Sequence, residues 1–185
     1  MKPAPFDYIR AGAIEQICAL LAEEARECRM IAGGQSLVPM MAMRLTRPEL
    51  LIDIAQVDEL RGISSTPQAV AIKACTRQVE IERSSEVAIS VPLLAAALPW
   101  IGHVQTRNRG TIGGSLAHAD PTAEMALVAA ALEAEVVLRH QDGERVLAIS
   151  DFLLGPLESA IEPNEMLVEV RFPHLPSSVR IGCAV

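Results

Sequence analysis

Residues 103–124 read HVQTRNRGTIGGSLAHADPTAE and carry the strongest functional signal in the chain. At their centre the motif TIGGS, residues 111–115, follows a third glycine at Gly110. The motif begins and ends with a hydroxyl residue, and Arg107 and Arg109 lie just upstream. Glycine lets the backbone approach an anion closely, and amides, hydroxyls and guanidinium groups are the donors that a diphosphate needs. The segment therefore predicts a diphosphate-binding loop.

The residues after this motif predict a helix that begins with a carboxylate. Asp120 and Pro121 have the residue types of an N-cap and a first helical position, and they open a helix expected over 121–132. A carboxylate N-cap occupies the positive end of the helix dipole and repels a phosphate there. We therefore expect loop amides, and not this helix terminus, to hold a diphosphate.

A second glycine motif, AGGQS at residues 32–36, lies between a predicted strand and a predicted helix. The first amides of a helix have no partner within the helix, so a phosphate site is physically reasonable here. An ordinary strand-to-helix turn capped by Ser36 is the simpler explanation of this loop taken by itself. Neither motif has the glycine spacing of a Rossmann fingerprint or of a P-loop.

The sequence also offers one candidate general base, His118, two residues before Asp120. No nucleophile elbow accompanies it, and the other histidines, His103, His140 and His174, are scattered. We therefore favour a structural or cofactor-packing role for His118 over that of a general base.

The composition excludes several classes of protein. The 185 residues carry a net charge of −7 and only 3% are aromatic, which leaves neither a basic face for nucleic-acid phosphates nor an aromatic platform for bases. The longest apolar stretch, VPLLAAALPWIG from Val91, is too short to span a bilayer. The N-terminal MKPAPFDYIR lacks the apolar run of a signal peptide. We expect a cytoplasmic protein without a transmembrane segment.

The cysteines are too widely spaced for an iron–sulfur cluster or a zinc site, so we predict no metal ligand and expect free thiols at the first three. They are Cys18, Cys28, Cys75 and Cys183.

The hydrophobic periodicity predicts an α/β pattern at the start of the chain. Apolar residues at helical spacing indicate a helix over 13–28, and short apolar runs indicate strands at 29–32 and 50–54 on either side of a helix over 37–45. Core positions are expected for Met40, Met41, Met43 and, further along, Trp100.

Beyond a boundary placed within 55–61, the chain predicts more strands. The expected elements are a strand at 70–75, helices at 77–86 and 91–102, a hairpin of 134–140 and 145–150, and a strand at 166–172. The last strand alternates, which predicts Met166, Val168, Val170 and Phe172 on one face and Leu167, Glu169 and Arg171 on the other.

The two glycine motifs together make the chain recognisable. AGGQSLVP at 32–39, followed by residues 103–124, resembles the FAD-binding medium subunit of molybdenum hydroxylases, the family of aerobic carbon monoxide dehydrogenase and the xanthine dehydrogenase FAD domain. FDYIRAGAIEQICALLAEEA from Phe6 is similar to the opening strand and helix of that family, and MLVEVRFPHLP from Met166 is similar to its closing strand. Lys73 and Cys75 stand where the family favours small or apolar residues.

The resemblance implies an α+β protein with the vanillyl-alcohol-oxidase-type (PCMH-type) FAD-binding fold. Two α/β subdomains, about 1–55 and 56–176, would clamp an extended FAD within a domain of residues 1–176. Residues 177–185 would be the truncated start of a C-terminal flavoprotein domain.

The resemblance also implies a set of FAD-binding residues. Residues 30–37 and 111–115 match the two diphosphate-binding motifs. Ile101 and Gly102 match positions on the adenine side of the cofactor. Leu167 matches a position near the flavin ring, although an ordinary half-buried leucine is an alternative. The full set is Met30, Ile31, Ala32, Gly33, Gly34, Gln35, Ser36, Leu37, Ile101, Gly102, Thr111, Ile112, Gly113, Gly114, Ser115, His118, Asp120, Glu124 and Leu167.

In function, the resemblance implies an electron relay. A large molybdopterin subunit would oxidise the substrate, a small subunit would pass the electrons through two [2Fe-2S] clusters, and the FAD of this chain would hand them to an external acceptor. Two alternatives remain open: a non-catalytic truncated fragment that binds FAD weakly or not at all and acts only in assembly, and a stand-alone flavin oxidase of the same fold.

Overall fold

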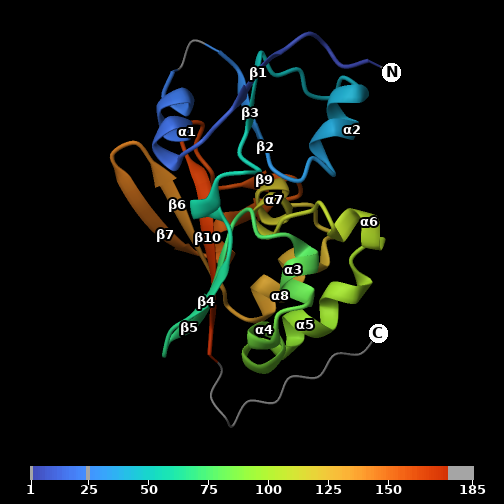
Figure 1. Cartoon of the computed structure of the whole chain (residues 1–185), viewed down its shortest axis with the longest axis vertical. Helices are drawn as coiled ribbons and strands as arrows, with labels where there is room; N and C mark the ends of the chain where they lie inside the picture. Colours follow the sequence, from blue (N-terminus) through green and yellow to red (C-terminus); the bar gives the residue numbers. More distant parts are fainter. Residues whose placement is uncertain (1, 24–25, 175–185) are drawn as a thin grey trace.

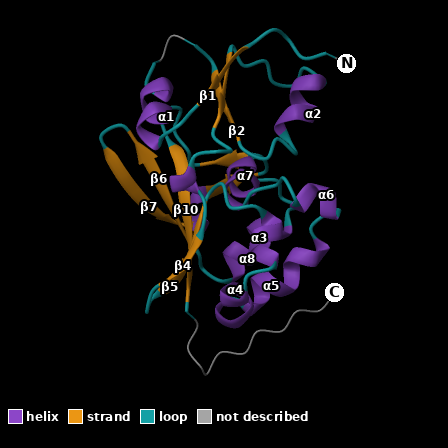
Figure 2. Ribbon diagram, in the orientation of Figure 1, coloured by secondary structure: helices purple, strands orange, loops and turns teal. Residues whose placement is uncertain are grey.

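The computed structural model describes residues 2–23 and 26–174. The predictions made for residues 177–185, including Cys183, lie outside this range. Within it, the chain forms two main sheets and a small two-stranded one, and helices cover one side of the largest sheet (Figures 1 and 2).

The first sheet is parallel and has the order β1-β3-β2. It contains β1 (Asp7–Arg10), β2 (Cys28–Ile31) and β3 (Leu50–Asp53). Each crossover passes through one helix, α1 (Ile14–Leu21) and then α2 (Leu37–Ala42). The central β3 begins with three buried apolar residues, Leu50, Leu51 and Ile52, as expected for a parallel strand covered on both faces, and ends at Asp53. The predicted strand–helix–strand unit is therefore confirmed.

The second sheet is antiparallel and has the order β4-β5-β10-β6-β7. Its strands are β4 (Ile63–Ser65), β5 (Ala69–Lys73), β6 (Glu135–His140), β7 (Gly143–Ala148) and β10 (Met166–Pro173). A small separate pair is formed by β8 (Leu153–Gly155) and β9 (Glu158–Ser159). The predicted hairpin is confirmed, with His140 paired to Gly143 at its turn.

Seven helices follow the first sheet in the described chain, together with 3-10 turns at Asp58–Leu60 and Leu98–Trp100. They are α3 (Gln78–Glu82), α4 (Ser85–Ser90), α5 (Pro92–Ala97), α6 (Val104–Arg107), α7 (Ile112–His118), α8 (Glu124–Ala131) and α9 (Ile149–Phe152). Figure 2 shows α3, α4, α5 and α8 gathered on one side of the five-stranded sheet.

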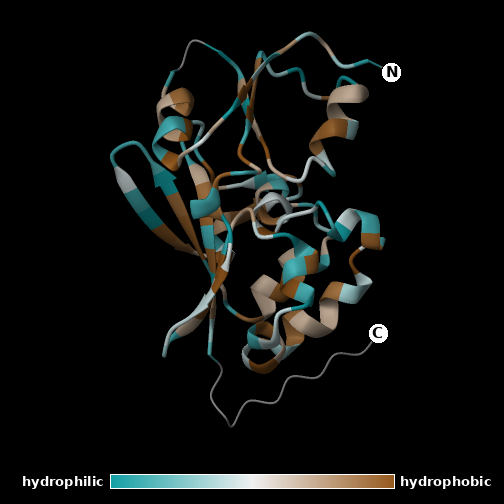
Figure 3. Ribbon diagram, viewed as in Figure 1, coloured by the Kyte–Doolittle hydropathy of each residue, from teal (hydrophilic) through white to brown (hydrophobic). Residues whose placement is uncertain are grey.

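Two apolar cores result from this arrangement. The larger core lies between the five-stranded sheet and its helices, and it includes Phe152 and Phe172. The smaller core joins α1 and the first sheet to the other face of the second sheet, since Ile17 and Ile52 share it with Val137. Figure 3 shows brown and teal residues side by side on α1, as expected for a helix with one buried face. The subdomain boundary within 55–61 stays a prediction.

The strict alternation predicted for residues 166–172 is wrong. The register of β10 against β6 shifts between Leu167 and Glu169, which marks a β-bulge. Met166 and Val168 therefore belong to the smaller core, whereas Leu167 joins the larger core together with Val170 and Phe172. Beyond the bulge, the side chains at even positions point to the opposite face of the sheet. Each face of β10 therefore contributes apolar residues to one of the two cores.

The charged residues of β10 are paired with each other, and Glu169 is buried while the Arg171 side chain is 39% exposed. Glu169 is 8% exposed and stands opposite Lys73 in the register. Lys73 Nζ lies 2.7 Å from Glu169 Oε2, and Arg171 Nε lies 2.6 Å from Oε1. Burial opposes the charged carboxylate, but these two partners outweigh it and lower the pKa of Glu169. Lys73, unusual in its strand, is therefore the counter-ion of a buried glutamate.

Several element boundaries differ from the prediction. The first helix ends at Leu21, and Cys28 already belongs to β2. The predicted helix over 91–102 ends at Ala97 and gives way to a 3-10 turn, because Pro99 cannot continue an α-helix. The predicted helix over 77–86 is likewise divided between α3 and α4.

Two core assignments are also wrong. Trp100 is 60% exposed because it ends the 3-10 turn on the outer side of the molecule. Of the three methionines, Met41 is buried, Met40 is half-buried and Met43 is 51% exposed. A helix of six residues has only one buried face, which cannot accommodate all three side chains.

Candidate functional site

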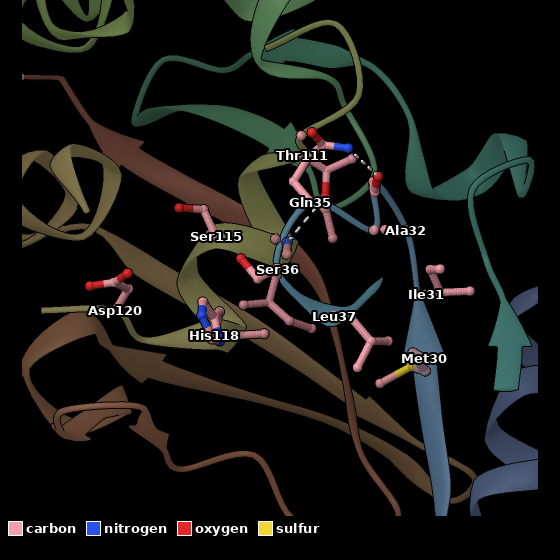
Figure 4. A pocket seen from close by; sticks show the side chains of 18 of the residues that line it. Met30, Ile31, Ala32, Gln35, Ser36, Leu37, Thr111, Ser115, His118 and Asp120 are labelled. Carbon is pink, nitrogen blue, oxygen red and sulfur yellow. Dashed lines mark hydrogen bonds between the residues drawn. The ribbon is translucent and has the colours of Figure 1, made fainter. Parts of the chain in front are cut away.

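A cavity of about 610 Å³ lies where the first sheet meets α7 and the start of β10. This volume is in the range of ordinary ligand pockets, roughly 300–1,000 Å³. Both glycine motifs line it, and Figure 4 shows the first loop facing the helix that carries Ser115 and His118. Segments that are distant in the sequence therefore form one site.

The first loop offers unused amides to this cavity. Gly34 has a φ of +70°, a conformation that glycine adopts without strain. The side chain of Gln35 donates to the Gly33 carbonyl oxygen at 3.0 Å, which braces the turn. Ser36 precedes α2 but its side chain makes no capping bond, so the turn capped by Ser36 is not what the structure shows. Among residues 2–23 and 26–174, the amides of residues 34–37 have no acceptor.

The second motif is arranged differently, because it forms the start of α7 rather than an open loop. Thr111 is the N-cap, and its hydroxyl accepts from the Gly114 amide at 3.2 Å. The Ile112 amide donates to Thr76 at 3.2 Å, and the Gly113 amide donates to Ala74 at 2.9 Å. These amides anchor α7 to the end of β5 and are not free for a ligand. Its exposed contribution to the cavity is the bare backbone of Gly114 and the side chain of Ser115.

The two motifs touch each other at Gly33. A Cβ on Gly33 would come within 2.2 Å of the Arg109 carbonyl oxygen and 2.9 Å of the Gly110 Cα. Only a residue without a side chain permits this approach. Gly113 has a similar role inside the fold, since its Cβ would lie 2.6 Å from the Cβ of Ala74. These two glycines are therefore required by packing between chain segments.

Asp120 does not cap a helix, contrary to the sequence prediction. Its carboxylate accepts from the amide and the hydroxyl of Thr122 at 2.8 and 2.7 Å, forming a local turn, and α8 begins only at Glu124 with Ala123 as N-cap. The Thr122 amide and then its hydroxyl lower the pKa of Asp120. Asp120 is therefore an ionised acceptor on the cavity wall.

His118 ends α7 and lines the cavity, followed by Ala119 in a left-handed conformation. In the described part of the chain no hydrogen bond joins His118 to Asp120. A hydrogen-bonded His–Asp pair is thus not formed in the described residues, and the packing role of His118 stays a prediction.

At one end of the cavity, Ile101 contributes an apolar wall. The segment from Pro99 to Gly102 is held by Arg107, whose guanidinium donates to the carbonyl oxygens of Pro99, Ile101 and Gly102 at 3.5, 3.2 and 3.3 Å. Glu82 binds the same guanidinium at 2.8 and 3.4 Å. The Arg107 side chain is 11% exposed, so it is a structural clamp rather than a ligand group.

Leu167 lies at the cavity and is 5% exposed, so it is buried rather than half-buried, and its place near the flavin ring stays a prediction. The structure brings most of the predicted site residues to the cavity: Met30, Ile31, Ala32, Gly33, Gly34, Gln35, Ser36, Leu37, Ile101, Thr111, Gly113, Gly114, Ser115, His118, Asp120 and Leu167. Three others do not line it: Gly102, Ile112 and Glu124. Ile112 is fully buried in the larger core.

No sequence pattern pointed to several other lining residues. Gln78, Thr106 and Ile54 belong to separate parts of the chain, and only the packing of α3, α6 and the first sheet brings them to the cavity. Gln78 is 4% exposed and its Oε1 is the single buried side-chain polar atom without a partner in residues 2–23 and 26–174.

Comparison with known proteins agrees with this geometry. A family described as "FAD binding domain in molybdopterin dehydrogenase" matches residues 4–175. The 6-hydroxypseudooxynicotine dehydrogenase complex subunit alpha of Paenarthrobacter nicotinovorans is 45% identical over 95% of this chain and 60% of that protein. The carbon monoxide dehydrogenase medium chain of Hydrogenophaga pseudoflava is 39% identical over 94% of this chain and 60% of that protein.

Solved structures give the same result. A carbon monoxide dehydrogenase from Hydrogenophaga pseudoflava superposes with a TM-score of 0.92 at 39% identity, over 96% of this chain and 62% of that one. Quinoline 2-oxidoreductase from Pseudomonas putida 86 gives a TM-score of 0.92 at 37% identity, over 96% of this chain and 61% of that one.

The fold and the match therefore define an FAD-binding domain of the PCMH type. The chain belongs to the family of FAD-binding domains of molybdopterin dehydrogenases, as its two glycine motifs indicated. It spans about 60% of the length of the curated relatives it matches. Among the described helices, none combines the length and the apolar character that a membrane crossing requires.

Proposed function

We propose that this chain binds FAD non-covalently in the cavity and serves as the flavin-carrying, electron-transferring part of a molybdopterin-dependent dehydrogenase. The observation that carries the proposal is the cavity itself. It is lined by both glycine motifs in a chain that the FAD-binding family matches over residues 4–175.

The residues present fit an extended flavin dinucleotide. Unpaired amides at residues 34–37 suit a diphosphate, because backbone N–H groups on a glycine turn bind anions. The bare backbone at Gly114 lets a ligand lie close to α7. Met30, Ile31 and Leu167 give the cavity apolar walls for ring systems. One buried polar atom, Gln78 Oε1, also lacks a protein partner beside this cavity.

Each group then has a distinct binding role. The first-loop amides and the hydroxyl of Ser115 donate to phosphate oxygens, while ionised Asp120 accepts from sugar or ribityl hydroxyls further along. Ile101 packs against the adenine, Leu167 packs near the flavin and excludes water, and His118 packs against the cofactor. FAD, when bound, supplies the two-electron and one-electron redox chemistry. The protein supplies orientation and electrostatics, and we assign no catalytic acid, base or nucleophile.

We infer that the chain acts within a larger assembly. The printed names of its relatives include a "complex subunit alpha" and a "medium chain". By analogy, a large molybdopterin subunit and a small [2Fe-2S] subunit would deliver electrons to the flavin, in the cytoplasm, for transfer to an external acceptor.

Flavin binding by the purified chain is the direct test. We expect apoprotein titrated with FAD to quench flavin fluorescence with saturation and to retain the flavin absorbance through gel filtration. Gly34→Ala should weaken binding, because its φ of +70° strains any side chain and the new Cβ would lie 3.2 Å from Val38 Cγ2. Gly12→Ala is the matched control, since its Cβ would meet nothing closer than Gln16 Oε1 at 4.0 Å. A parent chain that binds no FAD would support the assembly-only alternative instead.

A further inference from the structure

Gln78 is a buried polar residue that contacts Gly110, at the place where the first glycine motif meets the residues just before the second. It is the first residue of α3, and its backbone amide donates to the Gly110 carbonyl oxygen at 2.8 Å. Gly110 in turn lies against Gly33, whose Cβ would come 2.9 Å from the Gly110 Cα. The side chain of Gln78 is therefore held at the point where both motifs meet, and it lines the same cavity.

The two ends of the Gln78 carboxamide have different surroundings. Oε1 is buried against Gly110, where a Cβ would lie 2.9 Å away, and it has no partner in the described residues. Nε2 also has no acceptor among them, yet it is not one of the buried unpartnered atoms. Since Gln78 lines the cavity, Nε2 is the end that retains access to it. The carboxamide thus presents a donor to the cavity.

A purely structural role does not explain this side chain. A buried amide with unused hydrogen-bonding capacity destabilises the fold, and an apolar side chain of the same shape would be neutral or better at this position. Sites that break such local rules are typical of ligand-binding positions. An acceptor in the cavity would supply the partner that Nε2 lacks, whereas Oε1, itself an acceptor, stays without a partner beside Gly110.

We propose that Gln78 is a further diphosphate-binding residue, whose Nε2 donates to a phosphate oxygen of the dinucleotide held between the two glycine motifs. This inference rests on the proposed function, because it takes the ligand of the cavity to be FAD. It assigns the second motif a different role from the first. The amides of Ile112 and Gly113 are occupied within the fold, and Gln78 supplies a donor beside them.

Three variants separate a contact with the phosphate from a structural role of the side chain. Gln78→Met keeps the shape of the side chain and removes the donor without adding charge. Gln78→Glu keeps the shape and an acceptor but replaces the donor by a negative charge. Gln105→Met makes the same chemical change at an exposed residue of α6 outside the cavity and serves as the control.

The experiment measures FAD affinity by fluorescence titration and the melting temperature of each apoprotein. We expect Gln78→Met to bind FAD about tenfold more weakly, as for loss of a hydrogen bond to a charged group. Its apoprotein should melt no lower than the parent, because the unpaired amide is gone. Gln78→Glu should bind more weakly than Gln78→Met, since a carboxylate repels a phosphate, and Gln105→Met should match the parent.

Four results would overturn the assignment. Equal FAD affinity of Gln78→Met and the parent would show that the donor contacts water and not the cofactor. A lower melting temperature of the Gln78→Met apoprotein would show a structural role. Binding by Gln78→Glu as tight as by Gln78→Met would indicate a hydroxyl partner instead of a phosphate. A parent that binds no FAD would instead refute the proposed function, and this inference with it.

Discussion

Gly33 and Arg109 are in contact so close that a single methyl group on Gly33 would come within 2.2 Å of the Arg109 carbonyl oxygen. Gly33 belongs to the first glycine motif, which follows β2, and Arg109 lies just upstream of the second motif, which opens α7. Their contact fixes the first loop against the start of the second motif, so the distance across the cavity depends on the absence of a side chain at Gly33.

Gly33→Ala should therefore disrupt the cavity. The new methyl group must displace backbone atoms of Arg109 and Gly110, an overpacking strain of about 1–3 kcal/mol. We expect a lower free energy of unfolding in urea and a loss of FAD affinity of at least about tenfold. Gly12→Ala, where the Cβ has room, should change neither quantity. Parent-like stability and affinity in Gly33→Ala would show that the two motifs do not need to touch.

Gly113→Ala should act on stability first, although its motif suggests a phosphate-binding role. The Cβ would lie 2.6 Å from the Ala74 Cβ, 2.8 Å from its carbonyl oxygen and 2.9 Å from its Cα. Backbone cannot yield as a flexible side chain does, so we expect a loss of about 2 kcal/mol or more in urea unfolding.

The apoprotein is the informative sample for Gly113, because its destabilisation does not depend on FAD. Gly143→Ala is the control, since its nearest neighbour would be His140 Nε2 at 3.9 Å. A variant that unfolds like the parent but has lost FAD binding would contradict the packing explanation and restore a direct ligand contact.

Arg107→Lys tests the clamp beside the cavity. Lysine keeps the charge but lacks the planar fork that reaches Glu82 and the carbonyl oxygens of Ile101 and Gly102 together. We expect a loss of about 1–2 kcal/mol in unfolding free energy, with weaker FAD binding because the Ile101 wall loosens. Arg83→Lys, at an exposed position just after α3, should behave as the parent in both assays.

Glu165 should make part of the stability depend on pH. Burial alone would raise its pKa, but the hydrogen bonds from Arg145 at 2.7 Å and from the Glu162 amide at 3.0 Å outweigh burial and lower it. A lowered folded-state pKa means that the stabilisation is complete above the unfolded pKa of about 4.3. It is lost as the pH falls through the folded pKa.

Glu165→Gln imitates the protonated side chain. We expect it to be less stable than the parent at pH 7 by about 1–3 kcal/mol, and the difference should shrink as urea unfolding is repeated towards pH 3. Glu59→Gln, at an exposed position, is the control and should follow the parent at every pH. A difference that stays constant from pH 7 to pH 3 would show that Glu165 does not contribute through its charge.

Local pattern predicted the elements wherever one short stretch carries its own signal. The short apolar run Leu50–Ile52 of β3 and the β6–β7 hairpin were both predicted from residue spacing and turn residues. The bulge in β10 was not, since alternation of residue types says nothing about a shift in register against β6. It moved Leu167 into the larger core and to the cavity.

The predicted helix boundaries near Asp120 and Trp100 were wrong because they depend on local contacts that residue types do not reveal. Asp120 and Pro121 have the composition of a helix start, but the Asp120 carboxylate bonds to Thr122 and the helix begins at Glu124. Trp100 is apolar and aromatic, yet Pro99 ends the helix before it and leaves the ring exposed. Both outcomes depend on local competition between hydrogen bonds that residue types alone do not resolve.

The sequence by itself determined the family, because two long glycine motifs in one chain are a more specific pattern than either motif alone, and the family match over residues 4–175 agrees with it. It also predicted most of the segments that line the cavity. Only the tertiary structure decided which amides are free to bind it, since those of residues 34–37 stay unpaired while that of Gly113 is used by Ala74. It also decided that Gln78 lies beneath both motifs. The physical reason is that hydrogen-bond satisfaction and burial are properties of neighbours in space, and these neighbours are distant in the sequence.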